Sequence, residues 1–198
     1  GPLFKGTEVK IAKDGEILVR GENIMNGYWN DTAATNATII NGWVHTGDIG
    51  EFDEDQYLKI TDRKKDIIVN AGGDNISPSR VEERLNIEPE IAQSMLYGDF
   101  KNYLVAIIVP DKEQTLTWAI KNNKPNELKL IIQDQDFISM IKEVTSKVNK
   151  KLSTIEQIRK FILIDEEFSI ENDMMTPTMK VKRFKVKNIY GDELEKLY

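Results

Sequence analysis

The segment Ile60-Thr61-Asp62-Arg63-Lys64-Lys65-Asp66-Ile67-Ile68 divides the sequence into two parts of different character. Its charged centre, residues 62–66, follows a part rich in short strands and precedes a part in which helices and strands alternate. Domain boundaries fall in polar segments of this kind, because few contacts cross them. The length of 198 residues also leaves room for two small units. We therefore expect a boundary at this segment.

Before this segment, hydrophobic alternation predicts short antiparallel strands. The expected strands lie at residues 7–11, 16–20, 49–52 and 57–60. Asp14-Gly15 is typical of the tight turn in a hairpin, and the acidic run 53–55 is expected to form the turn of a second hairpin. A polar helical turn is expected at residues 31–37. Because so few strands bury little surface, this part is not expected to stand alone.

Beyond the segment, the sequence predicts a second unit of the α+β class. Ser77 and Pro78 are typical of a helix start, as the capping residue and the first-turn proline. Strands and helices are expected at residues 67–69, 94–97, 103–109, 111–121 and 137–148. The apolar residues of the last range fall on one helical face, which favours a buried core helix over a lipid-binding stripe. A short terminal helix is expected to close the chain.

The composition is that of a folded protein and excludes several kinds of site. Hydrophobic residues make up 40% of the chain and charged residues 30%. With no cysteine and only His45, the chain has too few ligands for a thiolate or histidine metal cluster. A lone histidine beside Trp43 is more often a packed, hydrogen-bonded side chain than a catalyst. The net charge of −6 disfavours unspecific nucleic-acid binding, and no apolar run is long enough to span a bilayer.

Three polar stretches are candidates for chemistry, at residues 42–48, 61–73 and 176–183. Each has a simple structural interpretation on its own. Thr46-Gly47-Asp48 is a common turn, and the charges of the second stretch are a common solvated run. Lys180 lies in a basic stretch that favours solubility. Only their order and spacing along the chain favour a shared function.

In that order and spacing, the stretches resemble the adenylate-forming superfamily, which includes acyl-CoA synthetases, luciferases and the adenylation domains of peptide synthetases. The match runs the length of the chain and begins with residues 16–28. Within the superfamily, residues 60–68 with 72–76, and residues 176–180, look most like the long-chain fatty acyl-CoA synthetases. The resemblance therefore implies an AMP-forming fatty acid–CoA ligase.

The resemblance also implies how the chain is divided. Residues 1–62 match the β-rich end of the family's large adenylating domain, residues 63–66 its hinge, and residues 67–198 its small mobile domain of mixed α and β structure. The family's phosphate-gripping loop, rich in Gly, Ser and Thr, is absent. We therefore expect a C-terminal portion of a larger enzyme, with an incomplete ATP site and no activity alone.

Lys180 matches the catalytic lysine of the family. Adenylation brings a carboxylate and the α-phosphate of ATP together, and two anions that repel need a cation at the reacting centre. A lysine is a long, flexible point charge that can reach into a cleft from a mobile domain and leave afterwards. Asp48 matches the carboxylate that accepts hydrogen bonds from the ribose hydroxyls, and Arg63 matches a second ribose contact. These three residues are the predicted reaction site.

Lys65 matches the hinge about which the small domain rotates between an adenylating and a thioester-forming arrangement. A polar boundary segment without packing to break suits a hinge. Gly72 and Gly73 match the segment that approaches the pantetheine arm of CoA, where glycine permits close backbone approach. The alternative interpretation of this glycine pair is a turn that ends a strand.

The resemblance implies a fatty acid, ATP with Mg²⁺, and CoA as substrates of the full-length enzyme, and the preceding large domain as partner. No residue of the chain is assigned to a metal, and no nucleic acid is expected. A cytoplasmic location is implied, with peripheral membrane association left open. The residues alone leave other functions open: activation of an aromatic, short-chain or carrier-bound carboxylate, a non-catalytic module that binds anions or nucleic acid, or a pseudoenzyme.

The sequence departs from the family pattern at two places. Gln56 replaces the glycine that is common in the acidic hairpin, and Met174-Met175 stands where a turn with glycine is frequent. Neither position belongs to the predicted site.

Overall fold

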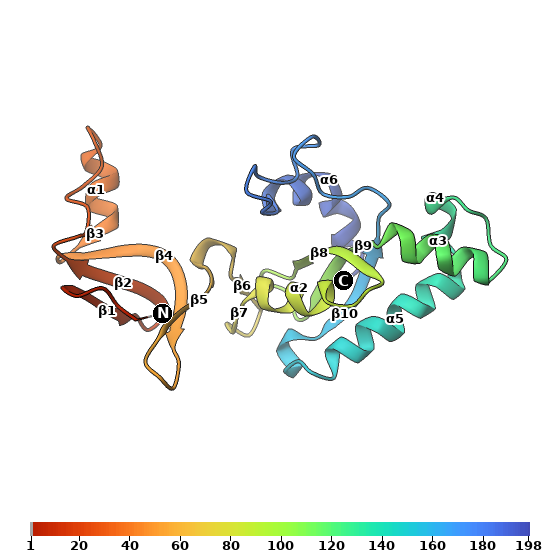
Figure 1. Cartoon of the computed structure of the whole chain (residues 1–198), viewed down its shortest axis with the longest axis horizontal. Helices are drawn as coiled ribbons and strands as arrows, with labels where there is room; N and C mark the ends of the chain where they lie inside the picture. The colour runs from red at the N-terminus through yellow and green to blue at the C-terminus, as the bar shows by residue number, and fades with distance from the viewer. Residues whose placement is uncertain (1) are drawn as a thin grey trace. The chain divides into compact units, whose positions relative to one another are not determined.

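A computed structural model describes residues 2–198, and the chain forms two compact units (Figure 1). The first unit ends at Ile67, and the second comprises Ile68–Tyr198. Each unit contains its own helices and strands, and each has its own β-sheet. The expected α+β fold class is confirmed.

The first unit is an antiparallel sheet with one short helix. Its elements are β1 (Thr7–Ile11), β2 (Glu16–Gly21), α1 (Thr32–Thr38), β3 (Ile39–Ile40), β4 (Trp43–Phe52), β5 (Leu58–Arg63) and the 3-10 turn η1 (Lys64–Asp66). The strand order is β1-β2-β4-β3, and β5 also pairs with β4. Both expected hairpins are present. The expected helical turn is also present as α1, and Asp31 caps it. β4 is longer than predicted, because the polar residues 46–48 interrupt its apolar alternation.

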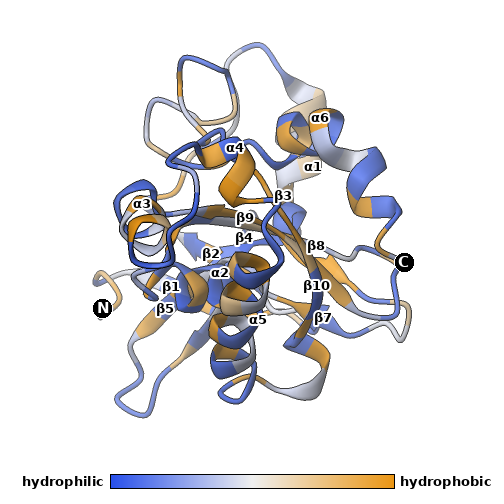
Figure 2. Ribbon diagram, turned by 90° about the vertical axis from the view of Figure 1, so that its right-hand side faces the viewer, coloured by the Kyte–Doolittle hydropathy of each residue, from blue (hydrophilic) through white to orange (hydrophobic). Residues whose placement is uncertain are grey.

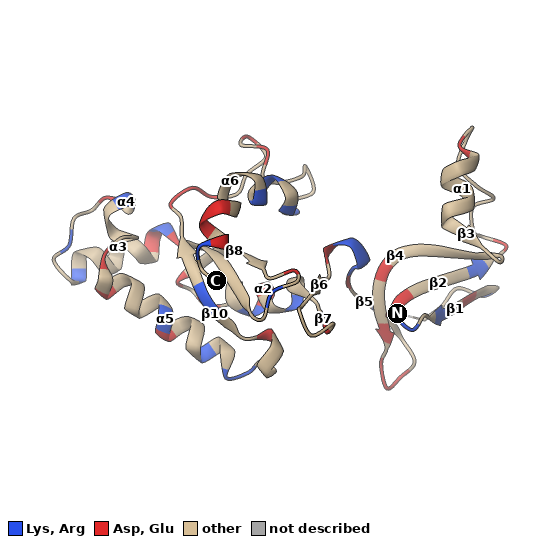
Figure 3. Ribbon diagram, turned by 180° about the vertical axis from the view of Figure 1, so that it is seen from behind, with Lys and Arg blue, Asp and Glu red and all other residues tan. Residues whose placement is uncertain are grey.

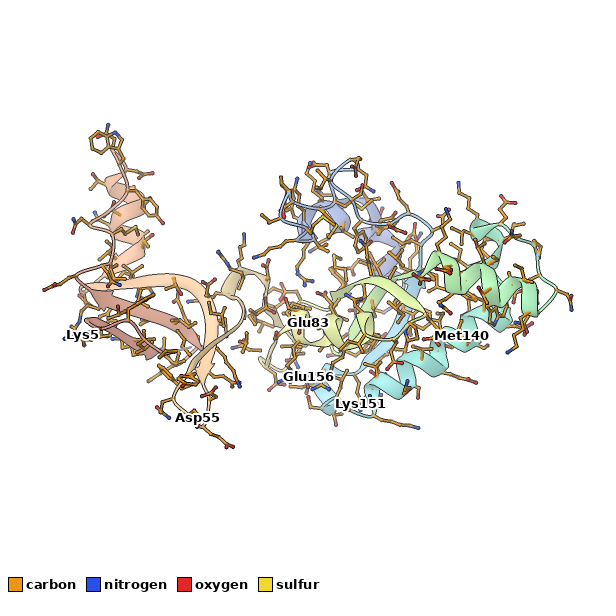
Figure 4. All side chains as sticks on the ribbon, viewed as in Figure 1. Lys5, Asp55, Glu83, Met140, Lys151 and Glu156 are labelled. Carbon is orange, nitrogen blue, oxygen red and sulfur yellow. The ribbon has the colours of Figure 1, made fainter. Side chains whose placement is uncertain are left out.

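The hairpin turns of this sheet require left-handed backbone angles. Gly15 has a φ of 85° in the β1–β2 turn, a conformation that glycine adopts without a steric penalty. Gln56 has a φ of 61° in the β4–β5 turn, where the resembled family commonly has glycine. Figure 4 shows Asp55 at the tip of this hairpin, with its side chain pointing away from the sheet. The departure at Gln56 thus falls on a position whose backbone favours glycine.

The second unit combines a mixed sheet with helices. Its elements are β6 (Ile68–Val69), β7 (Asn75–Ile76), α2 (Pro78–Asn86), β8 (Ile91–Tyr97), β9 (Leu104–Pro110), α3 (Lys112–Lys121), α4 (Leu128–Ile131), α5 (Gln135–Asn149), the 3-10 turn η2 (Thr154–Glu156), β10 (Ile158–Leu163) and α6 (Arg183–Glu195). The main sheet has the order β10-β9-β8, and β6 and β7 form a separate hairpin. Ser77 caps α2, as predicted.

The central strand β9 is buried on both faces, which explains its continuous apolar sequence. Leu104, Ala106 and Ile108 pack with residues of α2 and α5, whereas the alternate residues, such as Ile107, pack with α6. Figure 2 shows hydrophobic colouring along this sheet. On the face of α5 predicted to be core, Phe137, Ile141, Val144 and Val148 are buried, and Ile138 and Met140 are half-buried. This sheet is therefore the core of the second unit.

Four elements of the second unit were not predicted: β7, α4, η2 and β10. β10 pairs in parallel with β9 after the helices α3 to α5, but its exposed Arg159-Lys160 pair interrupts the apolar pattern. The short α4 has too few residues for a helical period. In addition, α6 begins inside the basic run, at Arg183, and not after it.

Phe137 provides a test of this packing. Its side chain is 1% exposed, and its ring meets the Trp118 ring edge-on with the centroids 5.0 Å apart. Phe137→Ala is expected to lower the free energy of unfolding by about 3–5 kcal/mol, because a cavity replaces the ring. Phe184→Ala, at a position 61% exposed, is the control and should change it by less than about 0.5 kcal/mol. Urea unfolding measures both, and equal effects would contradict the assigned core.

Candidate active site

Asp48 lies in a bulge of β4. Glu16 pairs with Ile49 and Leu18 pairs with His45, so Thr46-Gly47-Asp48 stands opposite a single residue of β2. Gly47 has a φ of 71° there, an angle that favours glycine. A bulge bends its strand and directs side chains away from the regular ladder. The Thr-Gly-Asp sequence therefore forms a local feature of β4, where the sequence alone indicated a turn.

Three hydrogen bonds hold this bulge in shape. The Thr46 hydroxyl donates to the Ile17 carbonyl at 2.7 Å and accepts from the Asp48 N–H at 3.1 Å. The Gly47 N–H donates to Glu16 Oε1 at 3.0 Å. Because backbone and side chain are both bound, the position of Asp48 is fixed by its neighbours.

The structure brings Asp48 and Arg63 together. They are direct partners in the β4–β5 ladder, and Arg63 Nε lies 2.7 Å from Asp48 Oδ1. The Asp48 side chain is 25% exposed and that of Arg63 is 53% exposed, so both are accessible to a ligand. A guanidinium has further N–H donors beyond Nε, and a carboxylate accepts several hydrogen bonds. The pair therefore offers donors and acceptors side by side, which suits the hydroxyl groups of a sugar.

Glu16 is a buried carboxylate behind this pair, and sequence reasoning did not identify it. Its Oε2 lies 2.9 Å from His45 Nδ1 and 3.0 Å from Lys64 Nζ. Burial raises the pKa of Glu16, but the hydrogen bonds from His45, Lys64 and Gly47 outweigh it and leave the pKa below its usual value. His45 is thus a packed, hydrogen-bonded histidine, as predicted.

Lys180 lies in a tight loop at the surface of the second unit. The Thr176 N–H donates to the Lys180 carbonyl at 2.8 Å, and the Lys180 N–H donates to the Thr176 hydroxyl at 3.1 Å. A β-bridge between Met175 and Val181 closes the loop. The Lys180 side chain is exposed, and its ammonium forms no ion pair within residues 2–198. The backbone at Lys180 is therefore held by hydrogen bonds, while the ammonium group is available to contact a ligand.

Buried groups hold the base of the Lys180 loop. Met174 and Met175 are 1% and 7% exposed and pack against the sheet, so the second departure from the family pattern serves the core. Lys182 and Lys185 both pair with Asp173, the latter at 2.6 Å. Figure 3 shows basic ribbon at the start of α6 and acidic ribbon towards its end.

The remaining predicted residues occupy turns. Lys65 is exposed in η1, which directly precedes the end of the first unit. Gly72 and Gly73 form the exposed turn between β6 and β7, and Gly73 has a φ of 85°. The turn is also closed by hydrogen bonds between Asn70 and Asp74. A turn is thus present, as the simpler interpretation of the glycines required, and their contact with pantetheine stays a prediction.

No metal cluster or membrane span is found among the described residues 2–198. In that range, no three His, Asp or Glu side chains are arranged to hold a metal ion, and no helix has the length and apolarity to cross a membrane. A pocket of ≈ 210 Å³ lies between α3 and α5, next to Trp118, Phe137 and Met140, the last of which Figure 4 labels. None of the predicted site residues lines it.

The fold is that of adenylate-forming enzymes, as the sequence predicted. Residues 65–198 match the family described as the AMP-binding enzyme C-terminal domain, and the chain belongs to this family.

Relatives of known name cover the first unit as well. The long-chain-fatty-acid–CoA ligase FadD15 of Mycobacterium tuberculosis is 39% identical over 200 residues, which cover 100% of this chain and 33% of the relative. Human long-chain-fatty-acid–CoA ligase 1 is 36% identical over 189 residues, which cover 93% of this chain and 27% of the relative. The chain thus spans about a third of the length of the relatives it matches. The predicted resemblance to long-chain fatty acyl-CoA synthetases is confirmed.

Solved structures share the fold. The adenylation domain of a carboxylate reductase from Mycobacterium chelonae has a TM-score of 0.78 at 23% identity, over 97% of this chain and 30% of that chain. The equivalent domain from Segniliparus rugosus, in complex with AMP and a carboxylic acid, gives 0.75 at 26% identity, over 93% and 28%. The o-succinylbenzoate CoA synthetase of Bacillus subtilis, in complex with AMP, gives 0.66 at 27% identity, over 94% and 34%.

The ion pairs of Asp173 predict how the base of the Lys180 loop responds to acid. Hydrogen bonds from Lys182 and Lys185 lower the pKa of Asp173 from 3.8 to about 2. A lowered pKa in the folded state means that this contribution to stability is complete above the unfolded value and is lost as the pH falls towards 2. NMR titration of the Asp173 carboxyl should give a midpoint near pH 2, and Lys182→Met should raise it.

Lys187→Met is the matched control, because Lys187 lies on the same helix and has no ion pair with Asp173 among the described residues. It should leave the Asp173 midpoint in place. An equal shift in both variants would mean that general charge, and not the direct pair, sets the pKa.

Proposed function

We propose that this chain is the C-terminal part of a fatty acid–CoA ligase, which activates a long-chain fatty acid with ATP and then forms acyl-CoA. Lys180 is the observation that supports the proposal most directly, because its exposed ammonium extends from a loop whose base is buried. The identity of 39% and 36% to ligases with that name supports the substrate class.

In the proposed reaction, Lys180 supplies positive charge during adenylation. The fatty acid carboxylate attacks the α-phosphate of ATP, pyrophosphate leaves, and negative charge accumulates on the transferring group. A cation placed there lowers the barrier because the charge develops in the transition state. A lysine without an ion pair among residues 2–198 loses no existing partner when it enters the site. In the second reaction, CoA displaces AMP from the acyl-adenylate.

Asp48 and Arg63 are proposed to bind the ribose of the nucleotide. Asp48 would accept hydrogen bonds from the hydroxyls, and Arg63 would both orient Asp48 and donate to the ligand. We assign no residue of this chain to Mg²⁺, which would arrive on the phosphates of ATP. Gly72 and Gly73 are proposed to approach the pantetheine arm of CoA.

The division into parts belongs to the same proposal. Residues 1–62 would end the large adenylating domain, residues 63–66 would be the hinge around Lys65, and residues 67–198 would rotate as the mobile domain. The large domain would supply the phosphate-binding loop and the acyl pocket. A cytoplasmic location, with peripheral contact to membranes where fatty acids partition, is part of this proposal.

A nucleic-acid-binding function is less well supported. The basic run before and within α6 would have to present free charges to phosphates. Lys182 and Lys185 pair instead with Asp173, and Arg183 pairs with Glu82 through two hydrogen bonds. Three of the five basic residues in this run are therefore held in ion pairs within the unit.

Lys180→Ala in the full-length ligase tests the proposed role. The rate of acyl-adenylate formation, measured through the release of pyrophosphate, is expected to fall by about 10²–10³-fold. This is the usual cost of removing one charge contact to a transition state. Thioester formation from supplied acyl-adenylate and CoA should change by less than about threefold, because that step does not need this cation.

Lys187→Ala is the control for a charge removed from the same basic run, and both of its half-reactions should match the unmodified enzyme. If Lys180→Ala slowed the two half-reactions equally, the lysine would have a general role in folding or docking, and the proposed assignment would be wrong.

A further inference from the structure

Glu16 connects two parts of the first unit that the sequence separates widely. It is the first residue of β2, and its side chain is 4% exposed. Its two carboxylate oxygens meet the β4 bulge on one side and η1 on the other. Burying a carboxylate costs free energy unless its oxygens accept hydrogen bonds or form ion pairs. These contacts therefore help to stabilise Glu16 in its buried position.

Towards β4, Glu16 binds the centre of the bulge and the residue that precedes it. Oε1 accepts the Gly47 N–H at 3.0 Å, and Oε2 lies 2.9 Å from His45 Nδ1. Gly47 directly precedes Asp48, so the bond to its amide limits how the backbone at Asp48 can turn. Hydrogen bonds to an ionised acceptor are about twice as strong as neutral ones.

Towards η1, Glu16 binds the lysine that opens the 3-10 turn. Lys64 Nζ lies 3.0 Å from Glu16 Oε2 and 2.7 Å from Asp14 Oδ2. The hydrogen bond to Asp14, followed by the hydrogen bond to Glu16, raises the pKa of Lys64. The sequence suggested that the polar boundary segment 62–66 has no packing to break. In the structure, Asp62 is 8% exposed and Lys64 is tied to Glu16 of β2, so this part of the expectation was wrong.

We propose that Glu16 is a positioning residue that serves the ribose pair and the hinge together. Its carboxylate keeps the bulge in the shape that presents Asp48, and through Lys64 it anchors the start of η1 to the sheet. Rotation of the mobile domain would then begin at Lys65 and leave Arg63 in its pairing with Asp48. The assignment of residues 63–66 as a hinge and of Asp48 and Arg63 as a ribose site rests on the proposed function.

This arrangement has a mechanical consequence. Arg63 ends β5 and Lys64 begins η1, so a hinge motion at Lys65 pulls directly on the residue beside the ribose pair. Without an anchor, each rotation would disturb the Asp48–Arg63 contact of 2.7 Å. The pairing of Lys64 with two carboxylates places the anchor immediately before the moving part.

Two variants separate the contacts of Glu16. Glu16→Gln keeps the size of the side chain and one acceptor oxygen, but its amide group cannot hold Lys64 as a carboxylate does. Lys64→Met removes only the link to η1, at a side chain that is 45% exposed and whose loss the fold should tolerate. Glu8→Gln is the control, because Glu8 lies in the same hairpin and forms an exposed ion pair with Arg20 at 2.5 Å.

Amide hydrogen exchange in the full-length protein, read by mass spectrometry, measures these effects. Glu16→Gln is expected to speed exchange about tenfold in peptides covering 45–50 and 63–67, in line with the loss of a charged hydrogen bond. Lys64→Met should speed it only in 63–67, and Glu8→Gln in neither. Unchanged exchange in 63–67 for Lys64→Met, or in 45–50 for Glu16→Gln, would overturn the inference.

Kinetics test the link to function separately. Glu16→Gln should raise the KM for ATP about tenfold while the KM for the fatty acid stays unchanged. Lys64→Met removes the anchor but leaves the bulge, so it should raise the KM for ATP by a smaller factor and alter the ratio of the two half-reaction rates. If the unmodified protein formed no acyl-adenylate, the proposed function would fail, whereas the exchange result would still decide whether Glu16 holds both segments.

Discussion

The ion pair between the buried Glu82 and the partly exposed Arg183 is the contact on which the arrangement of the second unit depends. Glu82, on α2, accepts the Leu96 N–H at 2.6 Å and two hydrogen bonds from Arg183 at 2.7 and 2.5 Å. It thereby joins α2, β8 and the start of α6. Removing one partner of such a pair is expensive, because a charge is left buried. The Lys180 loop enters α6 at this point and is therefore attached to a rigid base.

In the first unit, different contacts hold the residues of the candidate site in position. There, a β-bulge and the carboxylate of Glu16 hold Asp48 against Arg63, so the acceptor and the donor are both prearranged. Preorganised polar groups need no rearrangement when a ligand arrives. The two units thus differ in character: one presents a fixed acid–arginine pair, and the other presents a lysine with a held backbone and an available charge. Such a division suits a reaction in which the cation is needed in only one of two steps.

Much of the fold could be predicted from the sequence, because the local patterns agree with the tertiary structure. β10 and Glu16 show why other features could not be predicted. The strand 7–11 alternates cleanly, and β9 is apolar throughout because both of its faces are covered. β10 escaped prediction because the exposed Arg159-Lys160 pair interrupts the apolar pattern of a strand whose other residues are buried or half-buried. Lys180, Asp48 and Arg63 were found through family resemblance, whereas Glu16 looks in sequence like an ordinary polar strand position. Only pairing across β2 and β4 shows that its side chain is buried.

The central claim is that Lys180 approaches the ribose pair in one reaction step and leaves in the other. The distance between spin labels at Glu54→Cys and Lys187→Cys tests it directly, because both positions are exposed, lie outside the site and belong to different units. This chain contains no cysteine, so within it the labels attach only at the two introduced positions. Double electron–electron resonance on the full-length protein should give one distance distribution with a non-reactive ATP analogue and fatty acid, and a clearly separate one with acyl-adenylate analogue and CoA. A single distribution, unchanged between these two conditions, would contradict the account.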